Sequence, residues 1–340
     1  MPEGQPQTGL VSLRWSIRLV HRYERIVCLP ETNQRIDSPG GGIEDVSDMI
    51  ARRPFLKVLA GATAGLAARP LMAGPKQDFP IGACDWSIKA RHNLAAFDIG
   101  TKIGLEGLQV SFSDPGTQLD LRERKVRDQY YRRSDETGIR IASLGMGVLN
   151  KLPLSTNPDS IKWVDDAIDV MAKMHKERPG QSPNVCLLAF FGKGDINGKP
   201  DLMKAVIRKL KTIAKKAEDN NVVFGIESLL SADDHLKLID GVGSKAIQVY
   251  YDSANSHRMG YNIYDEVVQI GGERICEVHC KENGALLGQG KIDFVRWQKQ
   301  LTKAGFKGWL IIEGAMPRKA EVVTAYRENF KLLNTVFRSA

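Results

Sequence analysis

Four side chains that can bind a metal ion each stand at the end of a short apolar run. They are Glu227, Asp252, His279 and Glu313, and the runs read NVVFGIE, AIQVYYD, RICEVH and WLIIE. Successive members of this set are 25, 27 and 34 residues apart, about the length of one strand and one helix. Parallel strands that each present such a side chain at their carboxyl end are typical of a barrel mouth. The set therefore predicts a metal centre.

Three carboxylates and one imidazole form a hard, oxygen-rich donor set with three negative charges. Such a set favours Mn²⁺, with Mg²⁺, Co²⁺ and Zn²⁺ as alternatives. Four protein ligands in an octahedral shell leave two neighbouring positions for a hydroxyl and a carbonyl oxygen of a substrate. The cation would then stabilise the enediolate that forms when the proton α to the carbonyl leaves. A carboxylate on each side of the substrate could remove and return that proton.

Eight apolar segments predict the strands that must position these ligands. Most are nearly continuous apolar runs, as expected for parallel strands that are covered on both faces. The predicted strands are residues 79–87, 104–112, 139–147, 184–192, 221–228, 246–253, 274–281 and 309–314.

Helix-like stretches alternate with these segments. The stretch 159–177 opens on Asp159 and Ser160 as a helix cap and places apolar residues on one stripe. The other predicted helices are residues 121–138, 201–220, 231–243, 261–272, 292–306 and 317–337.

The alternation predicts an α/β fold, a (β/α)8 TIM barrel in a single domain over residues 79–337. The 267 residues that follow position 73 suit the ~250 of such a barrel. An open doubly wound sheet would need a glycine-rich fingerprint after its first strand, and DWSIKARHN lacks one.

The segment before the predicted barrel resembles a targeting signal. ARRPFLKV at residues 51–58, followed by a small and apolar run, makes residues 49–73 resemble a twin-arginine export signal with cleavage after Ala73. The apolar run 58–68 is too short to form a stable membrane span. We expect residues 1–48 to be disordered or not translated, with Met49 as the true start. The mature protein is then periplasmic or otherwise extracytoplasmic.

Composition narrows the class of partner. The chain is 42% hydrophobic and 26% charged, as for an ordinary folded enzyme, with a formal net charge of +8. No cluster of Lys and Arg interleaved with aromatic residues is present in the sequence, so we expect no nucleic-acid partner.

Five motifs occur in a fixed order along the second half of the chain: GIES, YYDSAN, EVHCKE, GQGKIDF and IIEG. In this order they resemble the xylose isomerase-like TIM barrel superfamily of sugar phosphate isomerases and epimerases, over about residues 79–337. The resemblance implies that the Glu, Asp, His and Glu of these motifs bind one divalent metal. It also implies that Glu227 and Glu313 transfer protons, that the substrate is a small sugar or keto-sugar, and that the protein forms a homodimer or tetramer.

Five further residues are expected to contact the substrate. Trp86 can stack on a sugar face, and Gln109 can bind a hydroxyl where relatives often have Glu. Asn255 stands where relatives often have His, so it can bind a hydroxyl but cannot carry a proton. His257 can replace that histidine from two residues further on, and Lys281 can stabilise an oxyanion.

The expected function is therefore a divalent-metal-dependent sugar isomerase or epimerase that works through an enediolate. A dehydratase or a keto-glycoside lyase could use the same site. A non-catalytic exported sugar-binding protein is a further alternative. A nuclease of the AP-endonuclease type has the same superfamily fold but needs more histidines than the sequence offers after position 73. Export argues against phosphorylated sugars as substrates.

The leader hypothesis predicts the start of the native mature protein. Amino-terminal sequencing of protein purified from its export compartment should begin at Gly74, because cleavage follows Ala73. Intact mass of the precursor should match a start at Met49. A mature protein that retains residues 1–48 would contradict the hypothesis.

Overall fold

The computed structural model of the protein describes residues 79–113 and 115–338. The predicted leader 1–48 and signal segment 49–73 lie outside the described residues. Within these described ranges, no helix has both the length and the apolar character that crossing a bilayer requires.

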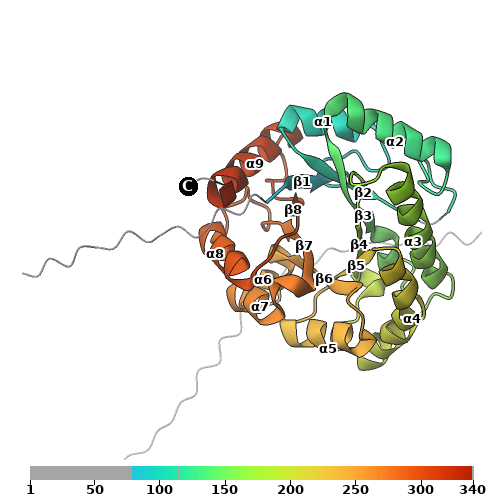
Figure 1. Cartoon of the computed structure of the whole chain (residues 1–340). Coiled ribbons are helices and arrows are strands. Elements are labelled where there is room, and N and C mark those ends of the chain that lie inside the picture. Colours follow the sequence, from blue (N-terminus) through green and yellow to red (C-terminus); the bar gives the residue numbers. More distant parts are fainter. Residues whose placement is uncertain (1–78, 114, 339–340) are drawn as a thin grey trace, which may run out of the picture. The chain divides into compact units, whose positions relative to one another are not determined.

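Eight parallel strands close into one barrel, and each strand pairs with its neighbours in sequence (Figure 1). The barrel closes where β1 pairs with β8. The strands are β1 Ile81–Cys84, β2 Gly107–Ser111, β3 Arg140–Met146, β4 Val185–Ala189, β5 Val223–Glu227, β6 Ile247–Asp252, β7 Ile275–Cys280 and β8 Leu310–Ile312. Each lies inside one of the eight predicted segments, so the (β/α)8 prediction is confirmed.

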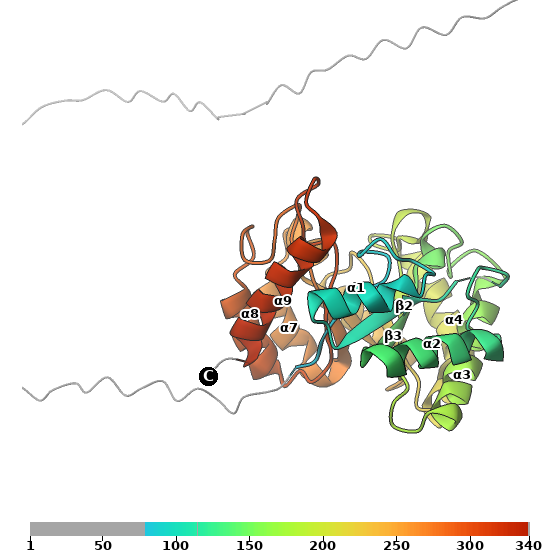
Figure 2. The same cartoon turned by 90° about the horizontal axis from the view of Figure 1, so that it is seen from above.

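Helices surround the strands on the outside of the barrel (Figures 1 and 2). They are α1 Ala95–Ile103, α2 Arg124–Thr137, α3 Ser160–Glu177, α4 Pro200–Asp219, α5 Ala232–Val242, α6 Ser253–Arg258, α7 Ile263–Ile270, α8 Phe294–Ala304 and α9 Val322–Arg338. The last helix, α9, packs beside the first, α1, which completes the ring. Both α1 and the short α6 were missed in the sequence. At α1 the preceding residue, Leu94, offers no capping side chain, and Asn93 Oδ1 instead accepts from the N–H of Ala95.

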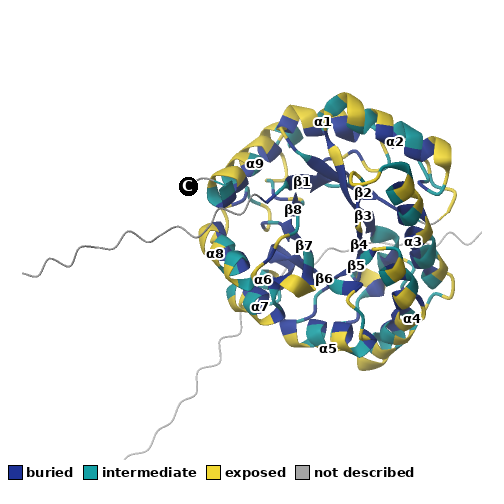
Figure 3. Cartoon of the chain, viewed as in Figure 1, coloured by how far each residue is buried: buried dark blue, intermediate teal, exposed yellow. Residues whose placement is uncertain are grey.

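The helices bury one face against the strands and expose the other, as the burial colours in Figure 3 show. On α4, Val206, Leu210 and Ile213 are buried at helical spacing. The predicted cap of α3 was wrong in detail. Asp159 makes no capping hydrogen bond with its side chain. Asn157 Oδ1 instead accepts from the backbone N–H groups of residues 159 and 160.

Small residues inside the barrel make room for aromatic rings. An added Cβ at Gly145 on β3 would lie 2.6 Å from the ring of Trp86, and one at Gly107 on β2 would lie 2.6 Å from Trp309. The glycine at position 145 therefore allows the Trp86 indole to lie across the barrel interior, next to the ends of the strands.

This close approach predicts that Gly145→Ala destabilises the protein by about 1–3 kcal/mol, the usual cost of overpacking. Urea unfolding followed by tryptophan fluorescence measures it. Gly147→Ala is the matched control, because an added Cβ there meets no atom of the described residues within 4 Å. Equal unfolding midpoints for the two variants would show that Trp86 moves aside at no cost.

Candidate metal centre and its cavity

The four predicted ligands meet at the carboxyl-terminal rim of the barrel. Glu227 and Asp252 are the last residues of β5 and β6. His279 is the last but one residue of β7, and Glu313 directly follows β8. Because all eight strands run in the same direction, these ends share one rim.

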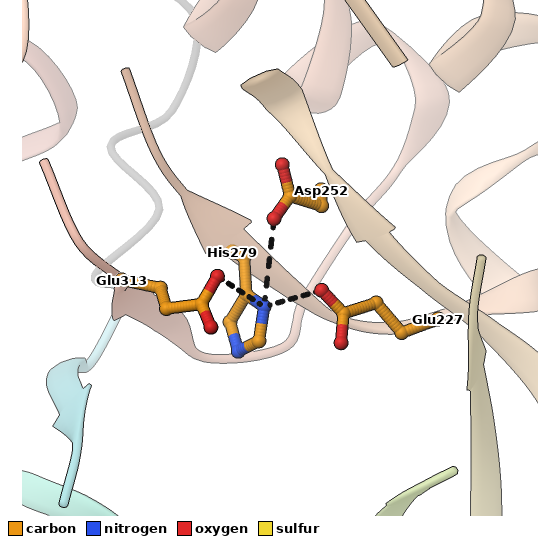
Figure 4. A group of neighbouring side chains, drawn as sticks. All are labelled: Glu227, Asp252, His279 and Glu313. Carbon is orange, nitrogen blue, oxygen red and sulfur yellow. Dashed lines mark hydrogen bonds and ion pairs between the residues drawn. The ribbon is translucent and has the colours of Figure 1, made fainter. Parts of the chain in front are cut away.

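One ligand atom from each of the four side chains lies within 4.8 Å of the others. His279 Nδ1 lies 3.0 Å from Glu227 Oε1, 3.8 Å from Asp252 Oδ2 and 3.6 Å from Glu313 Oε2. Figure 4 shows Glu227 and Glu313 approaching this nitrogen from opposite sides. The spacing is compact enough for one ion to contact all four groups after small movements.

Asp252 provides an independent test of whether a cation fits. Its Oδ1 accepts a 2.7 Å hydrogen bond from the backbone N–H of Asn255 and so caps α6. Its Oδ2 is buried and accepts no hydrogen bond from any residue that the structure describes. The ammonium group of Lys281 lies 3.4 Å from this oxygen as an ion pair, but a buried carboxylate oxygen without a hydrogen bond still costs stability. A hard divalent cation would satisfy that oxygen, and the rest of the donor set suits such an ion.

Lys281 lies against the carboxylates that the cation would join. Its Nζ lies 2.6 Å from Glu313 Oε2 and 3.4 Å from Asp252 Oδ2. Trp86 Nε1 donates a 2.8 Å hydrogen bond to the other oxygen of Glu313. Glu313 is thereby held by two donors from different elements.

The two glutamates have different electrostatic surroundings. Burial works to raise the pKa of Glu313, but the charges of His279 and Lys281 and the hydrogen bonds from Lys281 and Trp86 outweigh it and lower the pKa to about 2. At Glu227, burial outweighs the opposing charge of His279 and raises the pKa to about 7. A bound cation would favour the ionised form of both carboxylates.

A cavity of about 290 Å³ opens directly over the centre. Five of the residues predicted from the sequence line this cavity: Glu227, Glu313, Trp86, Asn255 and Lys281. The structure therefore brings both proposed proton-transfer groups and three of the five predicted substrate contacts to one hollow.

The other two predicted substrate contacts lie elsewhere. Gln109 is fully buried beneath the centre, where its Oε1 lies 2.9 Å from His279 Nε2. Its amide is occupied by hydrogen bonds inside the barrel and does not line the cavity. His257 is half-buried on α6 and is likewise not part of the cavity wall. It follows Asn255 by two residues, a rotation of about 200° on a helix, so it faces away from the side on which Asn255 lines the cavity.

Several cavity residues were missed in the sequence. Two are arginines, Arg91 and Arg258, which come from the loop after β1 and from α6. Ser111 and Ser113 line the cavity at the end of β2, where the same strand-end rule could have found them. Asn150 follows β3 in a short turn that carries no distinctive sequence signal.

The model of one protein family, described as the xylose isomerase-like TIM barrel, matches residues 97–336. The chain belongs to this family. A curated relative, 2-epi-5-epi-valiolone 7-phosphate 2-epimerase of Actinoplanes sp. strain SE50/110, is 22% identical over 180 residues. That match spans 53% of this chain and 64% of the relative.

Solved structures share the barrel at low sequence identity. Apo 3-keto-D-glucoside 4-epimerase from E. coli is similar with a TM-score of 0.60 and 16% identity, over 76% of this chain and 99% of that one. D-psicose 3-epimerase, solved in the presence of D-fructose, has a TM-score of 0.60 and 14% identity, over 77% of this chain and 100% of that one. A xylose isomerase domain protein from Planctomyces limnophilus has a TM-score of 0.60 and 16% identity, over 79% of this chain and 100% of that one. At these identities the likeness demonstrates the fold.

The geometry predicts that Mn²⁺ stabilises the wild-type barrel and stabilises Asp252→Asn much less. A ligand at 100 times its dissociation constant adds about 2.7 kcal/mol to the folded state. The variant replaces the buried carboxylate, whose Oδ2 accepts no hydrogen bond from the described residues, with an amide, which should weaken binding by at least about tenfold. Thermal unfolding with and without Mn²⁺, with metal content by mass spectrometry, measures this.

Glu273→Gln, an exposed substitution at the opposite end of the barrel just before β7, serves as the control and should respond like the wild type. A wild-type protein that Mn²⁺, Mg²⁺, Co²⁺ and Zn²⁺ all fail to stabilise would contradict the assignment of a metal centre.

Proposed function

We propose that this protein is a divalent-metal-dependent sugar isomerase or epimerase that removes a proton α to a carbonyl group. The observation that carries the proposal is the pair of carboxylates, Glu227 and Glu313, which face the same point from opposite sides beneath one cavity. A proton removed on one side of a bound sugar can be returned on either side by this pair. Three of the relatives described above are named as epimerases of sugars or of a sugar-like phosphate, which supports the same reaction class.

In this proposal Glu227, Asp252, His279 and Glu313 hold the cation, with Mn²⁺ favoured. When bound, the cation would polarise the substrate carbonyl and stabilise the enediolate negative charge. The rest of the work belongs to the chain's own residues. Glu227 and Glu313 take and return the proton, and the carboxylate that is not acting as the base remains on the other face of the sugar.

The remaining cavity residues would orient the sugar. The indole of Trp86 is fixed by its hydrogen bond to Glu313, so it offers a preset apolar face to a sugar ring. The Nζ of Lys281 lies beside Glu313, where it can donate to an oxygen that becomes negative during proton removal. Asn255 offers its side-chain amide to a hydroxyl. His257 would need to act from outside the cavity wall.

We further propose that the enzyme acts in an extracytoplasmic compartment on free keto-sugars or keto-glycosides. The basis is the twin-arginine pattern at Arg52 and Arg53, because sugar phosphates are mostly cytoplasmic. The curated relative is named for a phosphorylated substrate, so a panel of free and phosphorylated sugars tests this part separately.

The proposed reaction predicts uptake of deuterium at the carbon next to the carbonyl when Mn²⁺-loaded protein turns over a keto-sugar in D₂O. Glu227→Gln and Glu313→Gln should each slow this exchange by about 10²- to 10⁴-fold, the usual contribution of a positioned acid or base. Proton NMR of the sugar measures the exchange, and Glu273→Gln provides the control.

Both variants are assayed at saturating Mn²⁺ with metal content checked, because each glutamate is also a proposed ligand. Sugar binding without exchange by the wild type would indicate a binding protein. Exchange with loss of a hydroxyl or an aglycone would indicate a dehydratase or lyase at the same site.

A further inference from the structure

A chain of buried hydrogen bonds leads away from the metal centre into the barrel. His279 Nε2, the ring nitrogen that faces away from the carboxylates, lies 2.9 Å from Gln109 Oε1. Gln109 Nε2 donates to Ser143 Oγ and to Tyr250 OH, each at 3.1 Å. Ser143 Oγ in turn donates to Glu277 Oε2 at 2.7 Å. All five side chains are at most 1% exposed.

We propose that Gln109 and Glu277 are positioning residues that keep a proton on Nε2 of His279 and leave the lone pair of Nδ1 for the cation. This inference rests on the proposed function only in requiring that a cation binds. It assigns Gln109 a role that differs from the substrate contact expected from the sequence.

The direction of every bond in the chain follows from the number of protons available. The hydroxyl of Ser143 has one proton, and it gives that proton to Glu277. Glu277 Oε2 is the acceptor of this bond. Ser143 must therefore accept from the other side, which requires the N–H group of an amide there.

The same proton count fixes which end of the Gln109 amide faces His279. With its NH₂ group on Ser143 and Tyr250, its oxygen must face His279. Cys84 Sγ lies 3.3 Å from this oxygen and 3.4 Å from His279 Nε2, so it can donate to the amide oxygen while it accepts from the ring nitrogen. An oxygen that only accepts requires the ring nitrogen opposite it to carry a proton.

The orientation of the Gln109 amide matters because the other ring nitrogen of His279, Nδ1, faces an acceptor that competes for the proton. Nδ1 lies 3.0 Å from Glu227 Oε1, a contact that by itself favours a proton on Nδ1. A proton there would occupy the lone pair that a cation needs. Hydrogen-bond partners on the far side of a metal-binding histidine fix its tautomer and ring orientation, and their loss typically costs 10- to 100-fold in metal affinity.

The first experiment replaces Gln109 with Met, which keeps the length of the side chain and removes the hydrogen bonds. In protein with ¹⁵N-labelled histidine and bound Mg²⁺, the wild type should give a proton signal for Nε2–H of His279, identified by its absence in His279→Gln. Gln109→Met should lose or strongly shift this signal and bind Mg²⁺ and Mn²⁺ about 10- to 100-fold more weakly.

Ile311→Val is the control for packing, because Ile311 lies in the same barrel interior outside the hydrogen-bonded chain. It should change neither readout. An unchanged His279 signal and unchanged affinity in Gln109→Met would overturn the inference. A wild type that binds no cation would instead count against the proposed function.

The second experiment tests the direction of the bonds and does not depend on metal. Gln109→Glu alone places two carboxyl groups around the hydroxyl of Ser143, and Glu277→Gln alone places two amides around it. The double variant reverses every donor yet still offers an oxygen to His279. Its urea midpoint should lie closer to the wild type than either single variant does, whereas additive losses would overturn the inference.

Discussion

Repulsion among three carboxylates at one rim of the barrel is the constraint to which the rest of the centre responds. Glu227, Asp252 and Glu313 would not be buried this closely without positive charge between them. Lys281 supplies part of that charge from the side, through contacts to two of the three groups. Asp252 Oδ2 has an ion pair with Lys281 but no hydrogen bond from any described residue, so this oxygen could also accept a cation.

Backbone groups as well as side chains hold the carboxylates of the centre in place. Asp252 uses one oxygen to cap α6 and leaves the second for the centre, so one residue ends a strand, starts a helix and offers a ligand. Glu313 is held from one side by Trp86 and from the other by Lys281. Trp86 can reach it because position 145 is glycine. A local feature of β3 thereby helps to orient the side chain of Glu313, which follows β8.

Much of the fold was predictable because parallel strands that are buried on both faces appear in the sequence as nearly continuous apolar runs. All eight apolar segments contain a strand, and the four predicted ligands lie close together at the strand ends. Helix starts were less predictable. At α1 the side chain of Asn93 rather than of Leu94 accepts from the N–H of Ala95, and α3 is capped by Asn157 rather than Asp159. Each case depends on backbone geometry that the spacing of residues does not reveal.

The sequence by itself determined which side chains reach the rim, since strand period, strand order and parallel direction fix where each strand ends. Only the tertiary structure decided which neighbours of those ligands face the cavity. Gln109 is near a strand end like the ligands, yet it lies beneath His279 because inward side chains of a tilted barrel stack in layers. Arg91 and Arg258 reach the cavity from a loop and a short helix. Their positions depend on how those segments fold back over the rim, a property of packing rather than of any local pattern.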